Sequence, residues 1–352
     1  MVEQLATGSA RDAALGRTVQ IVVEGRSMRA CYIERLGPAE EIRYGELPRP
    51  EPGLGQVLVR ADAVAVNPVD TYVRSGRYPT PLPGFPFVVG RDLVGVVERT
   101  GPAARTQFAP GQRVWSASLG HDGRQGAAAE YVAVAAERLY RLPYGVDPVT
   151  AVAAVHPAVT AYLGLVVHAG GIGPGDTVVV QGAAGNVGTA VTELAVALGG
   201  RVLALARADD GSWCREHGAA AVIDYTASDL AEQVGRQVPE GAAVWFDTSG
   251  RPAIDAAVRV LAARGRLVVI AGRDTIAGLP LWPFYTNSLR LVGFVVSTAT
   301  VPELSRAARC VNALLAGGRL VPRIAEVLPL SRTARAHRLV EQGVRGRIVT
   351  TL

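Results

Sequence analysis

The chain has 352 residues, and 49% of them are apolar, which is enough for a large core and for two domains. No run of 18 or more uninterrupted apolar residues occurs, so we do not expect a membrane span. The net charge of +5 is spread thinly, which argues against nucleic-acid binding through a basic patch. All 36 basic residues are arginines, which excludes Schiff-base chemistry and a lysine phosphate clamp.

The N-terminal segment and the cysteines indicate the compartment. The first 27 residues lack the charged start, apolar stretch and cleavage site of a signal peptide. The three cysteines, Cys31, Cys214 and Cys310, lie far apart, which is typical of reduced thiols. We therefore expect a cytoplasmic protein, and we interpret residues 1–27 as a natural extension or a cloning remnant outside the fold.

The two halves of the chain differ in their predicted elements. Residues 29 to about 150 form short β-rich stretches between turn signals, such as 56–60 and 93–98. Residues 151–169 are Ala-rich with helical spacing, and apolar strands then alternate with helical stretches. The five strands are 177–180, 201–206, 221–223, 243–246 and 266–270. This alternation predicts βαβ units around a parallel sheet. An amphipathic helix (Val301–Ala316) and a strand (Arg347–Thr351) follow.

Three glycines after the first of these strands are the most informative feature. Gly182, Gly185 and Gly188 follow strand 177–180 and stand in and before a helix predicted from Asn186 to about Leu198. Glycine allows backbone N–H groups to approach a pyrophosphate, and the positive end of the helix dipole then faces the phosphates. This arrangement predicts a dinucleotide site.

The end of the next strand distinguishes NADP from NAD. An NAD site usually has Asp or Glu there to bind the ribose hydroxyls. Here Ala206 is followed by Arg207, whose guanidinium suits a 2′-phosphate. In the alternative, Arg207 is a solvated surface residue and Asp209 or Asp210 binds the ribose of NAD, although both lie later in the chain. The sequence favours NADPH.

A metal site is not expected. A catalytic zinc needs three side-chain ligands, and a structural zinc commonly has four cysteines. The five histidines, His121, His156, His168, His217 and His337, show no ligand spacing, and the cysteines do not cluster. We interpret each histidine as a surface or hydrogen-bonded residue.

Three motifs in order resemble the zinc-independent quinone oxidoreductases of the medium-chain dehydrogenase/reductase superfamily, which include lens zeta-crystallin. They are the segment from Asn67 through Tyr72 to Tyr78, Thr160-Ala-Tyr162 before the glycine turn, and the tail from Ala336 to Gly343 leading to 346–349. The resemblance covers about residues 28–352. It implies an α/β fold with a Rossmann doubly wound parallel sheet (151–295) inserted into a GroES-like β-rich catalytic domain (28–150 and 296–352). It also implies a homodimer formed partly through the Rossmann sheets.

The resemblance also implies the site residues. Asn67, Tyr72 and Tyr78 would line the cleft beside the nicotinamide. The residues expected to bind the cofactor, those of the glycine turn and Arg207 included, are Thr160, Gly182, Ala184, Gly185, Asn186, Val187, Gly188, Arg207, Tyr225, Thr248, Gly272, Arg273, Phe294 and Arg347. Relatives often carry a Lys for the 2′-phosphate, so Arg207 would substitute for it. Gly90-Arg91-Asp92 stands where zinc-containing relatives have Gly-His-Glu.

Hydride transfer to a quinone or an α,β-unsaturated carbonyl places negative charge on oxygen, which hydrogen-bond donors stabilise. Tyr72, Tyr78 and the Asn67 amide are the candidate donors, although each Tyr could instead only pack against a planar acceptor. We predict a metal-free, NADPH-dependent oxidoreductase for such small molecules, with no nucleic-acid or membrane partner. Two alternatives remain: an enoyl reductase for enoyl thioesters or polyketide-type substrates, and a non-catalytic NADPH-binding protein with a structural or RNA-regulatory role.

Overall fold

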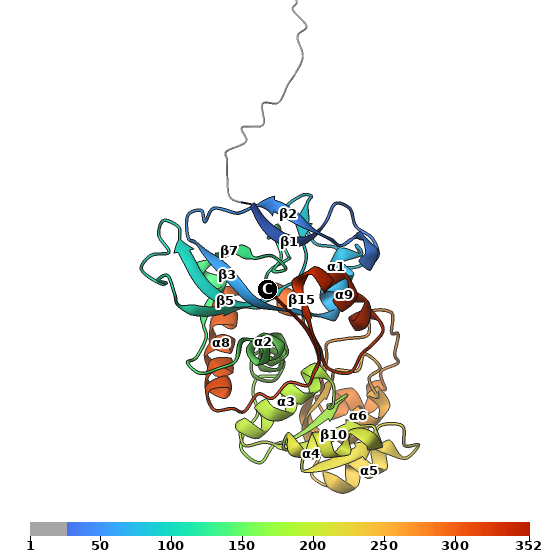
Figure 1. Cartoon of the computed structure of the whole chain (residues 1–352). Helices are drawn as coiled ribbons and strands as arrows, with labels where there is room; N and C mark the ends of the chain where they lie inside the picture. Colours follow the sequence, from blue (N-terminus) through green and yellow to red (C-terminus); the bar gives the residue numbers. More distant parts are fainter. Residues whose placement is uncertain (1–26) are drawn as a thin grey trace, which may run out of the picture.

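The computed structural model describes residues 27–352 and shows two domains that meet around the helix α2 (Pro148–Tyr162) (Figure 1). A β-rich domain lies at the top of the view, and an α/β domain lies at the bottom. The extension predicted for residues 1–27 lies outside the described residues, apart from Ser27, where the first strand begins. The α/β class, the parallel Rossmann sheet and the separate β-rich domain predicted from the sequence are confirmed.

The β-rich domain is made by two distant parts of the chain. Its large sheet has the strand order β15-β16-β3-β5-β6-β8, with β7 paired to β3, and a small sheet has the order β2-β1-β4. The strands are β1 (Ser27–Ile33), β2 (Arg43–Pro48), β3 (Gln56–Val66), β4 (Phe87–Val88), β5 (Asp92–Thr100), β6 (Arg113–Ser116), β7 (Tyr131–Ala135), β8 (Tyr140–Arg141), β15 (Ile324–Pro329) and β16 (Arg347–Thr351); the helices are α1 (Pro68–Arg74) and α9 (Thr333–Glu341). Successive side chains of β3 point to opposite faces of the sheet and so contribute to two hydrophobic cores. Ala63 and Ala65 pack with α2, and Val64 packs in the core of the β-rich domain on the other face.

The α/β domain is a six-stranded parallel sheet in the order β11-β10-β9-β12-β13-β14, which is the doubly wound order 3-2-1-4-5-6. Its strands are β9 (Thr177–Gln181), β10 (Arg201–Ala206), β11 (Ala221–Asp224), β12 (Ala242–Asp247), β13 (Leu261–Val269) and β14 (Arg290–Gly293). Helices α2, α3 (Asn186–Ala197), α4 (Gly211–Glu216) and α8 (Val301–Ala316) share the core on one face, and α5 (Leu230–Gln237) and α6 (Ile254–Val260) share the core on the other. The short helix α7 (Leu281–Thr286) precedes β14.

Several elements differ from the prediction, and β13, for example, begins at Leu261 instead of residue 266. The sixth strand, β14, was not predicted, because it is short and its Leu291 is 47% exposed at the sheet edge. Helix α2 begins at Pro148 rather than residue 151, because Asp147 caps it by accepting a hydrogen bond from the Thr150 N–H at 2.7 Å. The helix continues as a π-helix over Leu163–His168.

The stretch Pro148–His168 is, among the described residues, the one helix long and apolar enough to cross a membrane. Most of it is buried between the two domains of the protein. This burial accounts for its apolar composition.

Candidate active site

A cleft of about 1140 Å³ separates the two domains. The Rossmann domain contributes the glycine turn and residues that follow the carboxyl ends of its strands, where ligands bind in open α/β sheets. The β-rich domain contributes α1, the residue before β5 and the start of β16. All the site residues predicted from the sequence line this cleft except Gly188.

The three glycines of the turn have three different roles. Gly182 has φ +78°, and a Cβ there would stand 2.7 Å from the Thr248 hydroxyl oxygen. Gly185 is the exposed N-cap of α3, so the free N–H groups of that helix begin at the cleft. A Cβ on Gly188 would stand 2.2 Å from the Gly182 carbonyl oxygen. Gly188 therefore packs α3 against the turn instead of facing a ligand.

The far end of the cleft carries an excess of arginine. The Arg207 Nε donates to the Tyr225 hydroxyl at 3.0 Å, and both residues line the cleft. The carboxylate of Asp210, one of the two candidate ribose ligands for NAD, is instead held by Arg323 at 3.1 Å and Arg345 at 3.5 Å. This end of the cleft is therefore lined by three arginines, Arg207, Arg323 and Arg345, and by the carboxylate of Asp210, which is already paired.

Arg323 and Arg345 were missed by the sequence analysis. They come from the C-terminal segment, more than a hundred positions from Asp210. Arg323 also lies over the Trp213 ring, with 4.2 Å between its guanidinium carbon and the ring centroid. No local motif marks either residue, because their position depends on how the domains meet.

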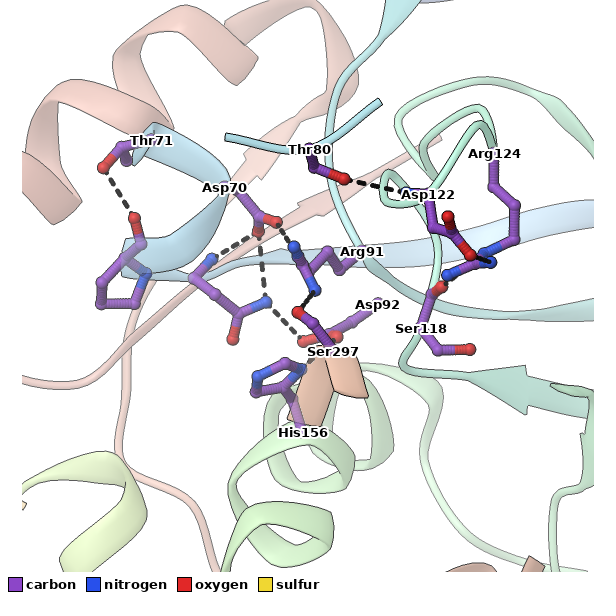
Figure 2. A network of polar contacts seen from close by, with 12 residues as sticks. Asp70, Thr71, Thr80, Arg91, Asp92, Ser118, Asp122, Arg124, His156 and Ser297 are labelled. Atoms are coloured by element: carbon purple, nitrogen blue, oxygen red, sulfur yellow. Dashed lines mark hydrogen bonds and ion pairs between the residues drawn. The ribbon is translucent and has the colours of Figure 1, made fainter. Parts of the chain in front are cut away.

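The other end of the cleft is backed by a buried polar network (Figure 2). Its centre is Asp92, the first residue of β5, which is fully buried. Oδ2 of Asp92 accepts from Asn67 Nδ2 at 2.8 Å and from Arg347 Nη2 at 3.1 Å, and Oδ1 lies 3.0 Å from His156 Nδ1. Strands β5 and β16, the start of α1 and the middle of α2 therefore meet at one carboxylate.

Asn67 lines the cleft as predicted, but its amide is not free for the donor role that was also predicted for it. Its Nδ2 group donates to Asp70 at 3.2 Å as well as to Asp92, and its Oδ1 accepts from Arg347 Nη1 at 2.8 Å. Its side-chain amide is therefore fully engaged inside the network and is not free to donate to a substrate oxygen. Arg347, predicted to touch the cofactor, lines the cleft but is likewise occupied by Asn67 and Asp92.

The two carboxyl groups of the network titrate differently. Burial raises the pKa of Asp70 to about 6, although Arg91 acts against this. Burial would also raise the pKa of Asp92, but the charge of His156, its hydrogen bond and the charge of Arg347 bring it below its ordinary value. Asp92 is therefore a firmly ionised carboxylate.

Arg91 is another charged residue at this end of the cleft, and the sequence analysis gave it no role in the site. Its Nη1 donates to the Ser297 hydroxyl at 2.7 Å, and its Nε lies 3.6 Å from Asp70 Oδ1. Its Nη2 is buried and has no hydrogen-bond partner among the described residues. The Arg91 guanidinium carbon lies 5.9 Å from the centroid of the Tyr78 ring.

His156 was interpreted as an ordinary surface or hydrogen-bonded histidine. It is hydrogen-bonded, but it also lines the cleft, and 12% of its side chain is exposed. Its partner Asp92 is 64 positions away in the sequence, so no spacing rule could have joined them.

Aromatic and hydroxyl side chains complete the cleft. Tyr72 and Tyr78 are half-buried, as predicted for residues of its wall, and the Tyr72 ring lies 5.8 Å from the Arg273 guanidinium. Phe294 stacks on His168 with 4.7 Å between the ring centroids. The Thr160 and Thr248 hydroxyls donate to backbone carbonyls, at 2.9 Å each, so towards a ligand they can only accept.

Comparisons with known proteins agree with this architecture. Residues 53–144 match the family described as alcohol dehydrogenase GroES-like domain, and residues 186–312 match the family described as zinc-binding dehydrogenase. A GroES-like domain joined to a Rossmann domain with a cleft between them defines a medium-chain dehydrogenase/reductase.

Full-length relatives narrow the class further. The chain is 30% identical to human quinone oxidoreductase over 319 residues, covering 90% of this chain and 94% of that protein. It is 28% identical to a 2-haloacrylate reductase of Burkholderia sp, with 88% and 94% covered. Among solved structures, a mycobacterial quinone oxidoreductase matches with a TM-score of 0.81 at 30% identity, covering 92% of this chain and all of that one. Escherichia coli quinone oxidoreductase complexed with NADPH matches with a TM-score of 0.79 at 25% identity, with 93% and 100% covered.

The chain belongs to the zeta-crystallin-like quinone oxidoreductases of the medium-chain dehydrogenase/reductase superfamily. It is an oxidoreductase with a site for a nicotinamide cofactor.

Proposed function

We propose that this protein uses NADPH to reduce a conjugated carbonyl compound, a quinone or an α,β-unsaturated carbonyl, without a metal ion. The observation that carries the proposal is the cleft itself. It joins an arginine-rich nucleotide end to a catalytic end with tyrosine walls and the buried guanidinium of Arg91. When bound, NADPH supplies the hydride.

The choice of NADPH rests on the charges around Arg207. The helix N-terminus after Gly185 offers free N–H groups to a pyrophosphate. Arg207 and Tyr225 then stand beyond β10, where a 2′-phosphate would lie. Because Arg323 and Arg345 already hold Asp210, that carboxylate is a poor acceptor for the ribose hydroxyls of NAD.

The catalytic end suits an acceptor that gains negative charge on oxygen. Two buried nitrogens of Arg91, Nε and Nη2, have no hydrogen-bond partner among the described residues, and the site is shielded from water, where a fixed positive charge stabilises an oxyanion strongly. Tyr72 and Tyr78 add flat faces for a planar acceptor, and their hydroxyls are further candidate donors. Arg91 and the tyrosines thus replace the Asn67 amide as the proposed oxyanion donors.

Metal independence rests on the kinds of side chain at this end. Residues 27–352 contain no group of three His, Cys, Asp or Glu side chains arranged to hold a metal ion. Arg91 stands where zinc-containing relatives have a histidine, and a guanidinium cannot be a metal ligand because it has no lone pair to donate. We propose that its charge takes the part that a Lewis acid would play.

We also propose a homodimer through the edge strand β14. Leu291 on this strand is 47% exposed, and Trp282 and Tyr285 on the adjacent helix α7 are 71% and 60% exposed. An unpaired parallel edge with exposed apolar side chains is suited to pairing with a second copy.

The test is a screen of NADPH oxidation with quinones, enals, 2-substituted enones, 2-haloacrylates and enoyl thioesters, with NADH in parallel. We expect turnover with at least one conjugated carbonyl and preference for NADPH. Preference for an enoyl thioester would favour the biosynthetic enoyl reductase instead. Tight NADPH binding with no turnover of any acceptor would favour the non-catalytic alternative.

The tyrosines are tested with the accepted substrate. If a phenol donates to the oxyanion, Tyr72→Phe or Tyr78→Phe lowers kcat, whereas a ring that only stacks gives a silent Phe variant and an Ala variant with a raised KM. Wild-type kinetics in both alanine variants would place the reaction elsewhere.

A further inference from the structure

The imidazole of His156 connects the buried polar network to the cleft. The side chains of Asp70, Asp92, Arg91 and Arg347 are between 0% and 2% exposed, whereas 12% of the His156 side chain is exposed. His156 also lines the cleft, one helical turn before Thr160 on α2. Among the described members of the network, it is therefore the titratable group best placed to exchange a proton with a bound molecule.

The network fixes the orientation of this imidazole. Asp92 Oδ1 lies 3.0 Å from His156 Nδ1, while Oδ2 is held by Asn67 and Arg347. The carboxylate therefore cannot turn away, and it holds the proton on Nδ1. Nε2 is left without a partner among the residues drawn in Figure 2. The His156 side chain lines the cleft. A carboxylate behind an imidazole also stabilises the doubly protonated ring.

We propose that His156, oriented by Asp92, is the proton donor that completes the reduction; this proposal rests on the proposed function. For an α,β-unsaturated carbonyl, hydride from NADPH forms the new C–H bond at Cβ, and the π electrons move to the carbonyl oxygen. The Nε2–H bond of His156 then breaks, and its proton forms the C–H bond at Cα. For a quinone, the same proton goes to oxygen and gives the hydroquinone. The neutral imidazole regains a proton from water, so atoms and charge balance.

Arg91 and His156 suit two different tasks at the catalytic end of the cleft. Arg91 carries a permanent charge and does not give up its proton, so it suits the oxyanion. Histidine can donate and regain a proton near neutral pH. The charged groups around His156 are Asp92 on β5, Asp70 on α1, Arg347 on β16 and Arg91 before β5.

The experiment compares wild type, His156→Asn and His217→Asn. Asn at 156 keeps a donor toward Asp92 but has no proton to offer in place of Nε2–H. His217 is the matched control, because its Nδ1 lies 2.7 Å from Glu193 and its side chain is also largely buried, but it does not line the cleft. Each protein reduces one accepted 2-substituted enone or 2-haloacrylate in D2O, across a pH range, and NADPH affinity and melting temperature are measured in parallel.

We expect kcat of the wild type to fall as the pH rises through one ionisation, because a general acid acts only while it carries its proton. His156→Asn should lower kcat by about 100-fold, abolish that ionisation and leave the NADPH Kd near its wild-type value. The wild type should place deuterium on one face of Cα, and His156→Asn should give a mixture of configurations, because solvent then protonates the enolate. A merely structural role of His156 would not change the stereochemistry.

The results distinguish a failure of the inference about His156 from a failure of the proposed function. If the wild type reduces the substrate and His156→Asn keeps its rate, pH profile and stereochemistry, the inference about His156 is wrong while the proposed function stands. If His156→Asn does not fold, a pH-independent kcat in the wild type alone would overturn the inference. No reduction of any conjugated carbonyl by the wild type would overturn the proposed function and this inference with it.

Discussion

Replacement of Gly185 by valine should separate cofactor binding from folding. The position has φ −77°, which a branched residue can adopt, and it is exposed. A Cβ there would meet only the Gly182 carbonyl oxygen, at 3.2 Å. Valine is a poorer N-cap than glycine, and we expect a cost of about 1 kcal/mol, or about 2–4 °C in Tm.

The effect on NADPH should be much larger. Gly185 lies directly before the free N–H groups of α3, where the backbone has to approach the pyrophosphate. An isopropyl group in that space would remove about two hydrogen bonds to a charged ligand. At about 1.5 kcal/mol each, this raises the Kd about 100-fold.

The assay is a fluorescence titration with NADPH together with a melting curve for each protein. Gly188→Ala is the contrasting variant, because its Cβ would stand 2.2 Å from one backbone atom and 2.7 Å from another, and it should lower the stability by 1–3 kcal/mol or more. A folded Gly185→Val variant with wild-type affinity would refute the assignment of this turn to the pyrophosphate. A Gly188→Ala variant that melts like the wild type would refute the account of how the turn packs.

Four further predictions concern other parts of the molecule. Arg207→Ala should weaken NADPH binding at least 10-fold and leave NADH binding nearly unchanged, because only NADPH carries the 2′-phosphate; equal losses would contradict the cofactor assignment. Prolonged chelation should leave turnover and Tm unchanged, and a stoichiometric zinc in active protein would overturn metal independence. Burial, reinforced by Arg74, lowers the pKa of His337 to about 3, so the neutral ring stabilises the fold above the unfolded pKa and this stabilisation is lost as the pH falls. Between pH 7 and pH 5 the wild type should lose about 2 kcal/mol relative to His337→Leu in urea unfolding, and parallel pH dependences would show the opposite. Leu291→Arg on β14 should shift sedimentation from dimer to monomer, and an unchanged sedimentation coefficient would place any interface elsewhere.

Much of the fold could be predicted because its signals are local. The helix Val301–Ala316 has a Thr300 and Glu303 capping box at its start, and its apolar residues repeat at helical spacing, so both ends were predicted as they are found. The strand Arg347–Thr351 was equally well marked. Strand β14 has no such mark, since it is four residues long and only one of its faces is covered.

Less of the candidate site than of the fold could be predicted from the sequence. The glycine turn could be predicted from the sequence, because the strand, the three glycines and the helix are neighbours in the chain. The pair formed by His156 and Asp92 depends on α2 packing against β5, and the pair formed by Arg323 and Asp210 depends on the domains meeting. Asn67 was correctly expected at the cleft, but the partners that occupy its amide lie up to 280 positions away.

The late position of β16 in the chain has a consequence for folding order. β16 pairs with β3, and the Arg347–Asn67 bond joins residues 280 positions apart, whereas paired residues of the Rossmann strands are much nearer in sequence, with Val178 and Val244 of β9 and β12 the most distant. Short-range pairing closes faster than long-range pairing, so we expect the Rossmann domain to form first and the sheet of the other domain to close last. An intermediate with β16 still unpaired would already present the glycine turn to a nucleotide but would lack Arg347 beside Asp92. Nucleotide binding should therefore precede the appearance of enzymatic activity during refolding.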